Sequence, residues 1–470
     1  MRALLISTYD LGRQPFGLAS PAAWLRGAGV EVTCVDTSRD ELQDDQIAVA
    51  SFVAFYLPMH TATRLAGPLI ARARRVNPSA RVCAYGLYAP LNEGWLREQG
   101  VHDVLGPEAE GDLVALVNSQ PPTSNSQPSG RRREGPPLLK PGMEGIARLA
   151  FVRPDRNGLP PLERYASLQM PDGSRRVAGS TDATRGCKHL CRHCPIVPVY
   201  AGQFRVIPVD VVVEDVRAQV AAGAQHMSFG DPDFFNGPTH ARRVLERIAS
   251  EFPGLTYDVT IKVEHLLKHR DLLAMLRDTG CLFITSAVES VDDAVLAKLK
   301  KGHTRAGFHE VAASCRAAGI ALVPTFVPFT PWTTLEGYVD LLEVIERLEL
   351  VEHVAPVQLA IRLLVTANSA LLDLPDIRQA VGPFDAASLI FPWRHRAARV
   401  DALQASVMGL VASHTNGSRS EMFGMIAALA RAQAGLSPRA PAPGRGRAVP
   451  TVTEPWYCCA EPTPQQLGAI

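Results

Sequence analysis

Short apolar runs alternate with helix-like segments along the first quarter of the chain. The apolar runs cover residues 3–7, 30–35, 47–56 and 81–85, and runs of this kind are typical of buried strands. Between them, residues 22–28 and 62–76 carry apolar side chains at helical spacing. This alternation predicts a parallel sheet with helices on both faces, which is a Rossmann-like domain, over residues 1–118.

A second series of strands and helices is predicted for the centre of the chain. The predicted strands are residues 177–183, 226–229, 256–261, 281–288, 321–327 and 357–364. Helical patterns separate them, at residues 209–222, 241–251, 269–279 and 308–318. Six βα units predict an α/β fold with a partial (β/α)6 barrel over residues 143–375, and place its chemistry at the carboxyl ends of the strands.

Segments of different composition connect and follow these two domains. Residues 119–142 are rich in Pro, Ser and Gly and contain three consecutive arginines, 131–133, which predicts a solvated linker or, alternatively, an anionic docking site. Residues 376–440 hold two further helical patterns and predict a small helical extension. The last segment, residues 441–470, is a proline-rich tail.

Composition and charge favour a folded protein with small-molecule partners. Hydrophobic residues make up 46% of the chain and charged residues 20%, and the formal net charge is +1. This balance gives no strong field for nucleic acid or a membrane surface, so neither is expected as a partner. Met1 and Arg2 run directly into a predicted strand without the pattern of a signal peptide. Nine cysteines, an odd number, favour thiolate chemistry in a reducing compartment, and we expect a cytoplasmic location.

Three of the cysteines lie close together just after a predicted strand. Cys187, Cys191 and Cys194 form a CxxxCxxC pattern. Thiolates bind iron–sulfur clusters well, and three of them leave one iron of a [4Fe–4S] cluster open to a further ligand. A structural zinc site with His189 or His193 as the fourth ligand is the alternative, but zinc sites usually bring paired motifs. The pattern therefore favours the cluster.

The cysteine triplet at the start of a βα series resembles the radical S-adenosyl-L-methionine (SAM) superfamily. The resemblance covers residues 145–372. It implies that the open iron binds the amino and carboxylate groups of SAM, and that an electron from the cluster cleaves a C–S bond of SAM to give a carbon radical. It also implies a reductase or flavodoxin-type electron donor.

Further candidate residues end the predicted strands, where the superfamily binds SAM. The expected SAM-binding residues are Asp231, Asp233, Lys262, Ser286, Glu289 and Arg362. The two aspartates correspond to the contact with the SAM amino group, and Ser286 and Glu289 to contacts with its ribose or carboxylate. Plainer interpretations stay open: turn residues around Pro232 for the aspartates, and a buried ion pair for Glu289.

The order of the two domains resembles cobalamin-binding radical SAM enzymes. Members that ligate cobalt through the protein generally use a DxHxxG loop after the first strand. Residues 9–17, the corresponding segment, contain no histidine. We therefore expect cobalamin to be an unlikely cofactor and the first domain to be a scaffold, although cobalt can also be held without a protein ligand.

Two adjacent cysteines, Cys458 and Cys459, lie near the end of the chain. Their Cα atoms are about 3.8 Å apart, shorter than the usual disulfide range, whereas two neighbouring thiolates suit a soft centre such as trivalent arsenic. Two idle thiols in a tail are the alternative. The sequence from Cys458 to Pro462 resembles the CCAEP ending of a small radical SAM group that also has a selenocysteine form, CUAEP, and includes the enzyme of arsinothricin biosynthesis.

That resemblance implies a specific reaction. The enzyme would transfer the 3-amino-3-carboxypropyl group of SAM to arsenite, which gives hydroxyarsinothricin and methylthioadenosine, with Cys458 and Cys459 binding the acceptor as catalytic residues. Two alternatives stay open, a cobalamin-dependent radical SAM methyltransferase and a zinc-stabilised binding protein without catalytic activity.

Overall fold

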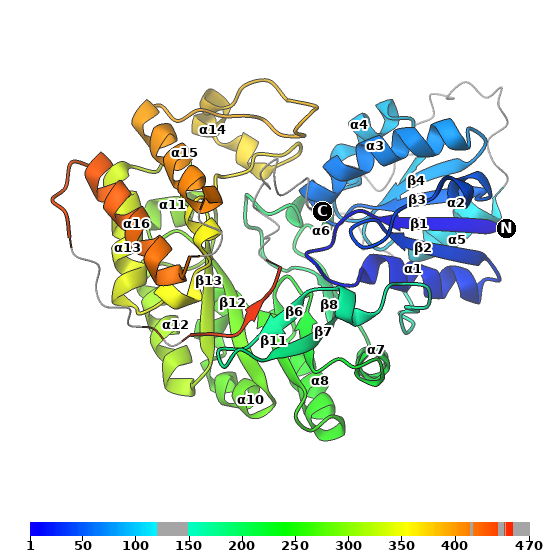
Figure 1. Cartoon of the computed structure of the whole chain (residues 1–470), viewed down its shortest axis with the longest axis horizontal. Coiled ribbons are helices and arrows are strands. Elements are labelled where there is room, and N and C mark those ends of the chain that lie inside the picture. Colours follow the sequence, from blue (N-terminus) through cyan, green and yellow to red (C-terminus); the bar gives the residue numbers. More distant parts are fainter. Residues whose placement is uncertain (120–148, 414–416, 440–445, 447, 455–470) are drawn as a thin grey trace.

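The computed structural model describes residues 1–119, 149–413, 417–439, 446 and 448–454. Two α/β domains lie side by side, the N-terminal domain in blue and the larger central domain in green and yellow (Figure 1). The linker predicted for residues 119–142 and the end of the tail, including Cys458 and Cys459, fall almost entirely outside the described residues.

The N-terminal domain is built on a five-stranded sheet in the order β2-β1-β3-β4-β5. Its strands are β1 (Arg2–Ser7), β2 (Glu31–Asp36), β3 (Phe52–Tyr56), β4 (Arg81–Tyr85) and β5 (Asp103–Val104), all parallel. Helices α1 (Phe16–Gly27) and α5 (Glu110–Asn118) pack on one face, and α2 (Asp44–Ala48), α3 (His60–Val76) and α4 (Glu93–Glu98) on the other. The Rossmann-like prediction is confirmed. Sheets with this order bind ligands beyond the carboxyl ends of β1 and β3, where the strand order reverses.

The central domain holds a seven-stranded sheet in the order β13-β12-β11-β10-β7-β6-β14. Five strands are parallel: β7 (Arg175–Thr181), β10 (His226–Phe229), β11 (Thr256–Thr260), β12 (Cys281–Glu289) and β13 (Ala321–Phe326). Two short antiparallel strands, β6 (Ser167–Gln169) and β14 (Thr451–Val452), extend one edge. The sheet curls into the half-barrel that six βα units predict.

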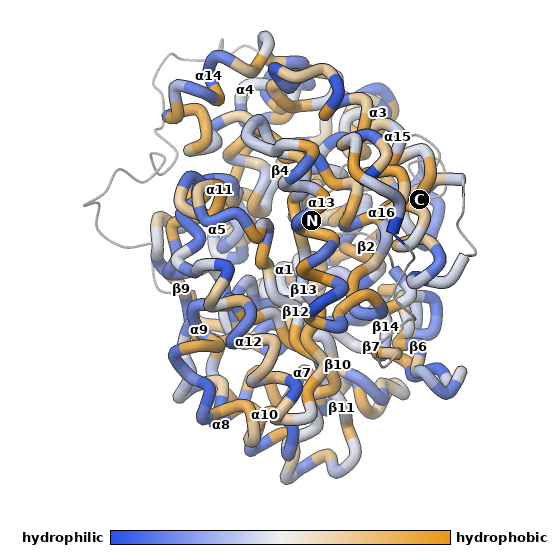
Figure 2. Tube along the Cα trace, turned by 90° about the vertical axis from the view of Figure 1, so that its left-hand side faces the viewer, coloured by the Kyte–Doolittle hydropathy of each residue, from blue (hydrophilic) through white to orange (hydrophobic). Residues whose placement is uncertain are grey.

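Helices cover the outer face of this sheet and enclose the largest core of the protein. They are α7 (Val209–Ala221), α8 (Pro238–Glu251), α9 (Val263–Lys268), α10 (Leu273–Asp278), α11 (Asp293–Lys298), α12 (Arg305–Ala318) and α13 (Leu335–Arg347). Figure 2 shows many hydrophilic residues on the outer helix α8, whose buried side chains, such as Val244 and Ile248, form one apolar stripe. Helices α15 (Ala398–Ser413) and α16 (Arg419–Gln433) pack beside α13, and a short helix α14 (Pro375–Ala380) precedes them.

The sixth predicted strand, residues 357–364, is not regular. A 3₁₀ helix, η6 (Pro356–Leu359), replaces its first half, because Pro356 suits the first turn of a helix and has no N–H for a strand ladder. The second half contacts the segment that follows β13 through one parallel bridge, between Phe329 and Arg362. The sixth segment therefore lies next to the fifth strand segment, as expected, but forms only one β-bridge in place of a regular strand.

Candidate functional site

A cavity of about 440 Å³ lies between the two domains, at the carboxyl ends of their strands. On the N-terminal side, the loops after β1, β3 and β4 contribute Asp10, Arg13, Pro58, Met59, Leu87 and Tyr88. On the other side, the strand ends of the half-barrel contribute Asp182, Asp231, Asp233, Lys262 and Glu289. The same cavity is also lined by the cysteine triplet, Cys187, Cys191 and Cys194. Both domains thus present their ligand-binding edges to one space.

The cysteine loop connects β8 (Thr184–Gly186) to α6 (Val197–Tyr200). On one side, the backbone N–H of Lys188 donates to Asn236 Oδ1 over 3.2 Å. On the other, the backbone N–H of Arg192 donates to the carbonyl of Leu299, at the end of α11, over 3.0 Å. Gly186, with a φ of +79°, starts the loop where a Cβ would lie 2.4 Å from the Tyr200 ring, so only glycine fits. The chain holds the loop firmly between two elements of the half-barrel.

The first cysteine gap contains His189, which belongs to a buried polar group on one side of the loop. His189 Nε2 lies 3.1 Å from Asp233 Oδ2, and His265 Nδ1 lies 2.7 Å from the same oxygen. Lys262 Nζ lies 3.1 Å from His189 Nδ1. The ligand atoms of His189, Asp233 and His265 are all within 4.8 Å of one another, which is close enough for a metal ion. If the Lys262 ammonium donates to His189 Nδ1, the ring donates its Nε2–H to Asp233. His265 Nδ1 lies near the same carboxylate but makes no hydrogen bond among the described residues. His189 is thus held by Asp233 and Lys262, which fixes this side of the loop.

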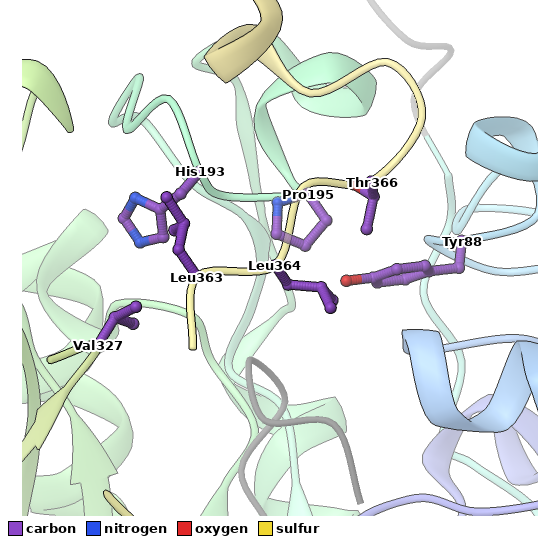
Figure 3. Close-up of a pocket in the computed structure, with 7 residues that line it drawn as sticks. All are labelled: Tyr88, His193, Pro195, Val327, Leu363, Leu364 and Thr366. Carbon is purple, nitrogen blue, oxygen red and sulfur yellow. The ribbon is translucent and has the colours of Figure 1, made fainter. Parts of the chain in front are cut away.

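The second gap contains His193, which is bonded on the other side of the loop. His193 Nε2 lies 3.1 Å from Glu289 Oε1, and Lys301 Nζ lies 3.3 Å from that oxygen. Burial alone would raise the pKa of Glu289, but the charge of Lys301 and the bond with His193 outweigh it and hold that pKa at about 2. A small cavity of about 20 Å³ lies between His193 and Tyr88 of the other domain (Figure 3). It has room for about one water molecule.

The three cysteines fit an iron–sulfur cluster better than a zinc ion. None of them forms a disulfide, and they share one cavity. Burial raises the pKa of Cys187 to about 11, so binding a metal there would release a proton from the thiol. A zinc site would need a histidine as the fourth ligand. Both ring nitrogens of His189 are already bonded, to Asp233 and Lys262. His193 keeps Nδ1 without a partner among the described residues, so the case against zinc rests on the single CxxxCxxC spacing, which lacks the paired motifs of zinc sites.

Asp231 lines the cavity, yet both of its oxygens are used within the protein. Oδ2 accepts the backbone N–H of Ala183 over 2.9 Å, and Oδ1 accepts the Thr184 hydroxyl over 2.6 Å. Burial, followed by the charge of Asp182, raises the pKa of Asp231 to about 7. Asp231 therefore fixes the strand that leads into the cysteine loop.

We expect Asp231→Asn to flatten the dependence of stability on pH. The raised pKa of Asp231 means that its stabilising contribution is complete below pH 4, the unfolded value, and is lost as pH rises toward about 7. An asparagine retains both hydrogen bonds, because its oxygen accepts from Ala183 and its amide donates to Thr184. Denaturant unfolding between pH 4 and 8 should show a gain at high pH of a few kcal/mol at most. A steeper loss in the variant would contradict this account.

Two of the predicted SAM-binding residues do not line the cavity. Arg362 instead donates to Asp401 Oδ1 over 2.7 Å and stacks its guanidinium 3.5 Å from the centre of the Trp393 ring. Ser286 is fully buried within β12, and its hydroxyl has no hydrogen-bond partner among the described residues. Asp231, Asp233, Lys262 and Glu289 do line the cavity.

Sequence reasoning did not single out several cavity residues. These are Asp10, Arg13, Tyr56, Tyr85, Asp182 and Arg185. Four come from the N-terminal domain, two from the loop after β1 and two from the ends of β3 and β4, and only the packing of the two domains brings them to the cysteines. Asp182 was the most accessible to prediction, since it directly follows β7 and lies five residues before Cys187.

A family model described as the radical SAM superfamily matches residues 182–345. Residues 182–345 of this chain therefore form a radical SAM superfamily domain. Among curated proteins, the tRNA-2-methylthio-N(6)-dimethylallyladenosine synthase of Fusobacterium nucleatum is 26% identical over 196 residues, which cover 37% of this chain and 42% of that protein. The ribosomal protein uS12 methylthiotransferase RimO of Parabacteroides distasonis is 25% identical over 34% of this chain and 39% of its own. The chain thus matches about two fifths of the length of these relatives.

Solved structures extend the likeness to both domains. The radical SAM methyltransferase TsrM from Kitasatospora setae, with cobalamin and a [4Fe–4S] cluster bound, has a TM-score of 0.58 at 18% identity, over 74% of this chain and 73% of its own. The cobalamin-dependent radical SAM enzyme OxsB, with aqua-cobalamin and SAM bound, has a TM-score of 0.63 at 11% identity, over 88% of this chain and 67% of its own. At these identities the likeness shows the shared fold.

These structures overturn the expectation that cobalamin is an unlikely cofactor. That expectation relied on the missing histidine after β1, but proteins with the same two-domain fold bind cobalamin. The histidine motif tests only the loop after β1. The cavity between the domains is also lined by the loops after β3 and β4, so the motif alone could not decide whether cobalamin binds. No helix within the described ranges is both long and apolar enough to span a bilayer.

Proposed function

We propose that this chain is a radical SAM transferase that attaches a fragment of SAM to a small acceptor held between its two domains, residues 1–118 and 143–375. Within that class, we propose the 3-amino-3-carboxypropyl group as the fragment and trivalent arsenic as the acceptor. The observation that carries the proposal is the cavity, where the cysteine triplet and the ligand-binding edge of the first domain face each other.

The residues of the cavity suit the proposed cofactors. Cys187, Cys191 and Cys194 would hold the cluster, which would supply the electron for cleavage of the Cγ–S bond of SAM to methylthioadenosine. Asp233, Lys262 and Glu289 surround the cysteine loop with both signs of charge, as a zwitterion such as SAM requires. Transfer to arsenite consumes two electrons and one proton and releases one water, so a reductase or flavodoxin-type donor must supply two electrons per turnover.

The C-terminal chain returns to the cavity, which supports a role for its last cysteines. Strand β14 pairs with β6 at the edge of the half-barrel sheet. Glu454, two residues after β14, accepts the Tyr9 hydroxyl over 2.8 Å. Its side chain also occupies the space that a Cβ on residue 12, a glycine, would need. Tyr9 and Gly12 flank Asp10 and Leu11, which line the cavity. Cys458 follows Glu454 by four residues, which an extended chain spans in at most about 14 Å, a length that is compatible with a thiol at the cavity.

A cobalamin-dependent methyltransferase is the second candidate, favoured by the position of the cavity. The cavity lies beyond the carboxyl ends of β1 and β3, where sheets with this strand order bind ligands. Aromatic side chains there, Tyr56, Tyr85 and Tyr88, suit a large planar cofactor. Among the described N-terminal residues that line the cavity there is no histidine, so a corrinoid would be held without one. When bound, cobalamin would supply a methyl carrier.

The nucleoside product distinguishes the two candidates. We expect the reconstituted, reduced protein to convert SAM into methylthioadenosine under anaerobic conditions, with arsenite increasing the yield and an arsenic-containing amino acid appearing in equal amount. Liquid chromatography with mass spectrometry of both products, with and without arsenite and with and without added hydroxocobalamin, is the measurement. Formation of 5′-deoxyadenosine that depends on the corrinoid would favour the methyltransferase. A protein that takes up iron and cleaves no SAM would contradict both.

A further inference from the structure

Two groups of polar side chains hold the cysteine loop, one on each side, and their ion pairs differ in exposure. Near His189, Lys262 is buried, but its carboxylate partner Glu264 is 44% exposed, so water screens that pair. In the other group, the side chains of His193 and Glu289 are each 6% exposed and that of Lys301 is 3% exposed. A charge on Lys301 therefore acts in a medium of much lower dielectric constant.

Lys301 lines the same cavity as Cys191 and Cys194. The charges of these two thiols act on its ammonium group and contribute to its raised pKa. Glu289 Oε1 connects it to the same loop, because that oxygen also bonds His193, the residue directly before Cys194. Lys301 is thus anchored to the loop by a carboxylate that the loop itself contacts.

The backbone is bent on both sides to bring this pair together. Glu289 has a φ of +68°, in the left-handed region that a residue with a side chain adopts only at a cost. The pairing of β12 with β13 shifts register at the same place. On the other side, Lys300 and Gly302, which flank Lys301, also have positive φ values. Backbone strain next to a predicted cluster site indicates that the position of the pair matters for function.

We propose that Lys301 is a positioning residue whose buried charge raises the reduction potential of the cluster on the cysteine loop, while Glu289 and His193 fix its place. The proposal rests on the cluster of the proposed function and goes beyond it. Reduction adds one negative charge to the cluster, and a fixed positive charge nearby stabilises the reduced form. Glu289 acts in the opposite direction, as a fixed negative charge.

The opposite signs of these two charges separate this role from a purely structural one. Loss of packing or of iron would affect replacements of Lys301 and Glu289 alike. A role of Glu289 in binding SAM alone would weaken SAM binding and leave the potential without SAM unchanged. Charge tuning instead predicts that the potential falls in Lys301→Gln and rises in Glu289→Gln. It also predicts that the double variant, which removes both charges, lies between the two single variants.

The experiment is an anaerobic redox titration of the full-length reconstituted protein without SAM, followed by the electron paramagnetic resonance signal of the reduced cluster. We expect Lys301→Gln to lower the midpoint potential below that of the wild type, and Glu289→Gln to raise it. Lys300→Gln is the matched control, since it removes the charge of the adjacent, exposed lysine and should leave the potential unchanged. Iron content, measured for every variant, shows that the signal comes from a complete cluster.

Lys301→Gln leaves the buried Glu289 carboxylate without its counter-charge and could therefore fail to take up iron. One comparison tests the role of the Lys301 charge even in that case. Glu289→Gln and the double variant differ only in the charge of residue 301, and neither contains that carboxylate. A lower potential in the double variant supports the proposal, and equal potentials overturn it. A wild-type protein that takes up no cluster overturns the proposed function as well, whereas equal potentials in loaded proteins overturn this inference alone.

Discussion

Replacing Cys187, Cys191 or Cys194 by alanine is expected to abolish the brown charge-transfer absorbance of the reconstituted protein and SAM cleavage together. Each thiol lines the same cavity, and a cluster with an open iron needs all three protein ligands, because loss of one removes a third of them and leaves a second iron without a protein ligand. The measurements are iron and sulfide content, the absorption spectrum and the yield of nucleoside. We expect turnover to fall below detection.

Cys315→Ala is the matched control for these variants. Cys315 is buried in α12 of the same domain and does not line the cavity. It packs as a small apolar side chain, so its truncation should cost about 1 kcal/mol and leave iron content and spectrum unchanged. Full iron content and turnover in any one of the triplet variants would contradict the assignment of that cysteine as a ligand.

The sequence predicted the parts of this site that lie close together along the chain. CxxxCxxC is a local pattern, and the end of each buried strand follows from its apolar run, so Asp231, Asp233 and Glu289 could be placed at the mouth of the barrel. What periodicity cannot supply is the direction of a side chain and its partner. Arg362 was expected to face the cavity, but the stacking surface of Trp393 and the carboxylate of Asp401 hold it elsewhere.

The contacts between domains were beyond prediction for a physical reason. They join residues far apart in the chain, such as Tyr9 and Glu454, and they depend on how two independently folded surfaces pack. A local motif therefore gave the wrong answer for cobalamin, because a missing histidine in one loop says nothing about the cavity that several loops form. The partners of His189 and His193 were also unpredictable, since both carboxylates are many residues away: Asp233 lies in the loop after β10 and Glu289 at the end of β12.

The most informative test of the proposed acceptor concerns the cysteines at the end of the chain. In Cys458→Ser/Cys459→Ser, we expect iron content, spectrum and SAM binding to stay at wild-type values, while transfer to arsenic falls by roughly 10²-fold or more. Hydroxyl is a poor ligand for a soft centre, and an acceptor that is no longer held next to the radical loses the benefit of proximity. Uncoupled formation of methylthioadenosine should persist, because the cysteine triplet is untouched.

Tyr9→Phe tests whether the contact with Glu454, the last described residue before the tail cysteines, matters in the same reaction. It removes only the hydroxyl that donates to Glu454, far from the cysteine loop in sequence, so it should lower transfer less than the double serine variant and leave the spectrum unchanged. Arsenite binding measured by thiol titration should follow the same order: wild type, Tyr9→Phe, double variant. If the double serine variant forms the arsenic product at the wild-type rate, Cys458 and Cys459 do not hold the acceptor. The choice of arsenic then loses its chemical basis, and the radical SAM domain keeps its cluster with an acceptor still to be identified among molecules that fit the cavity.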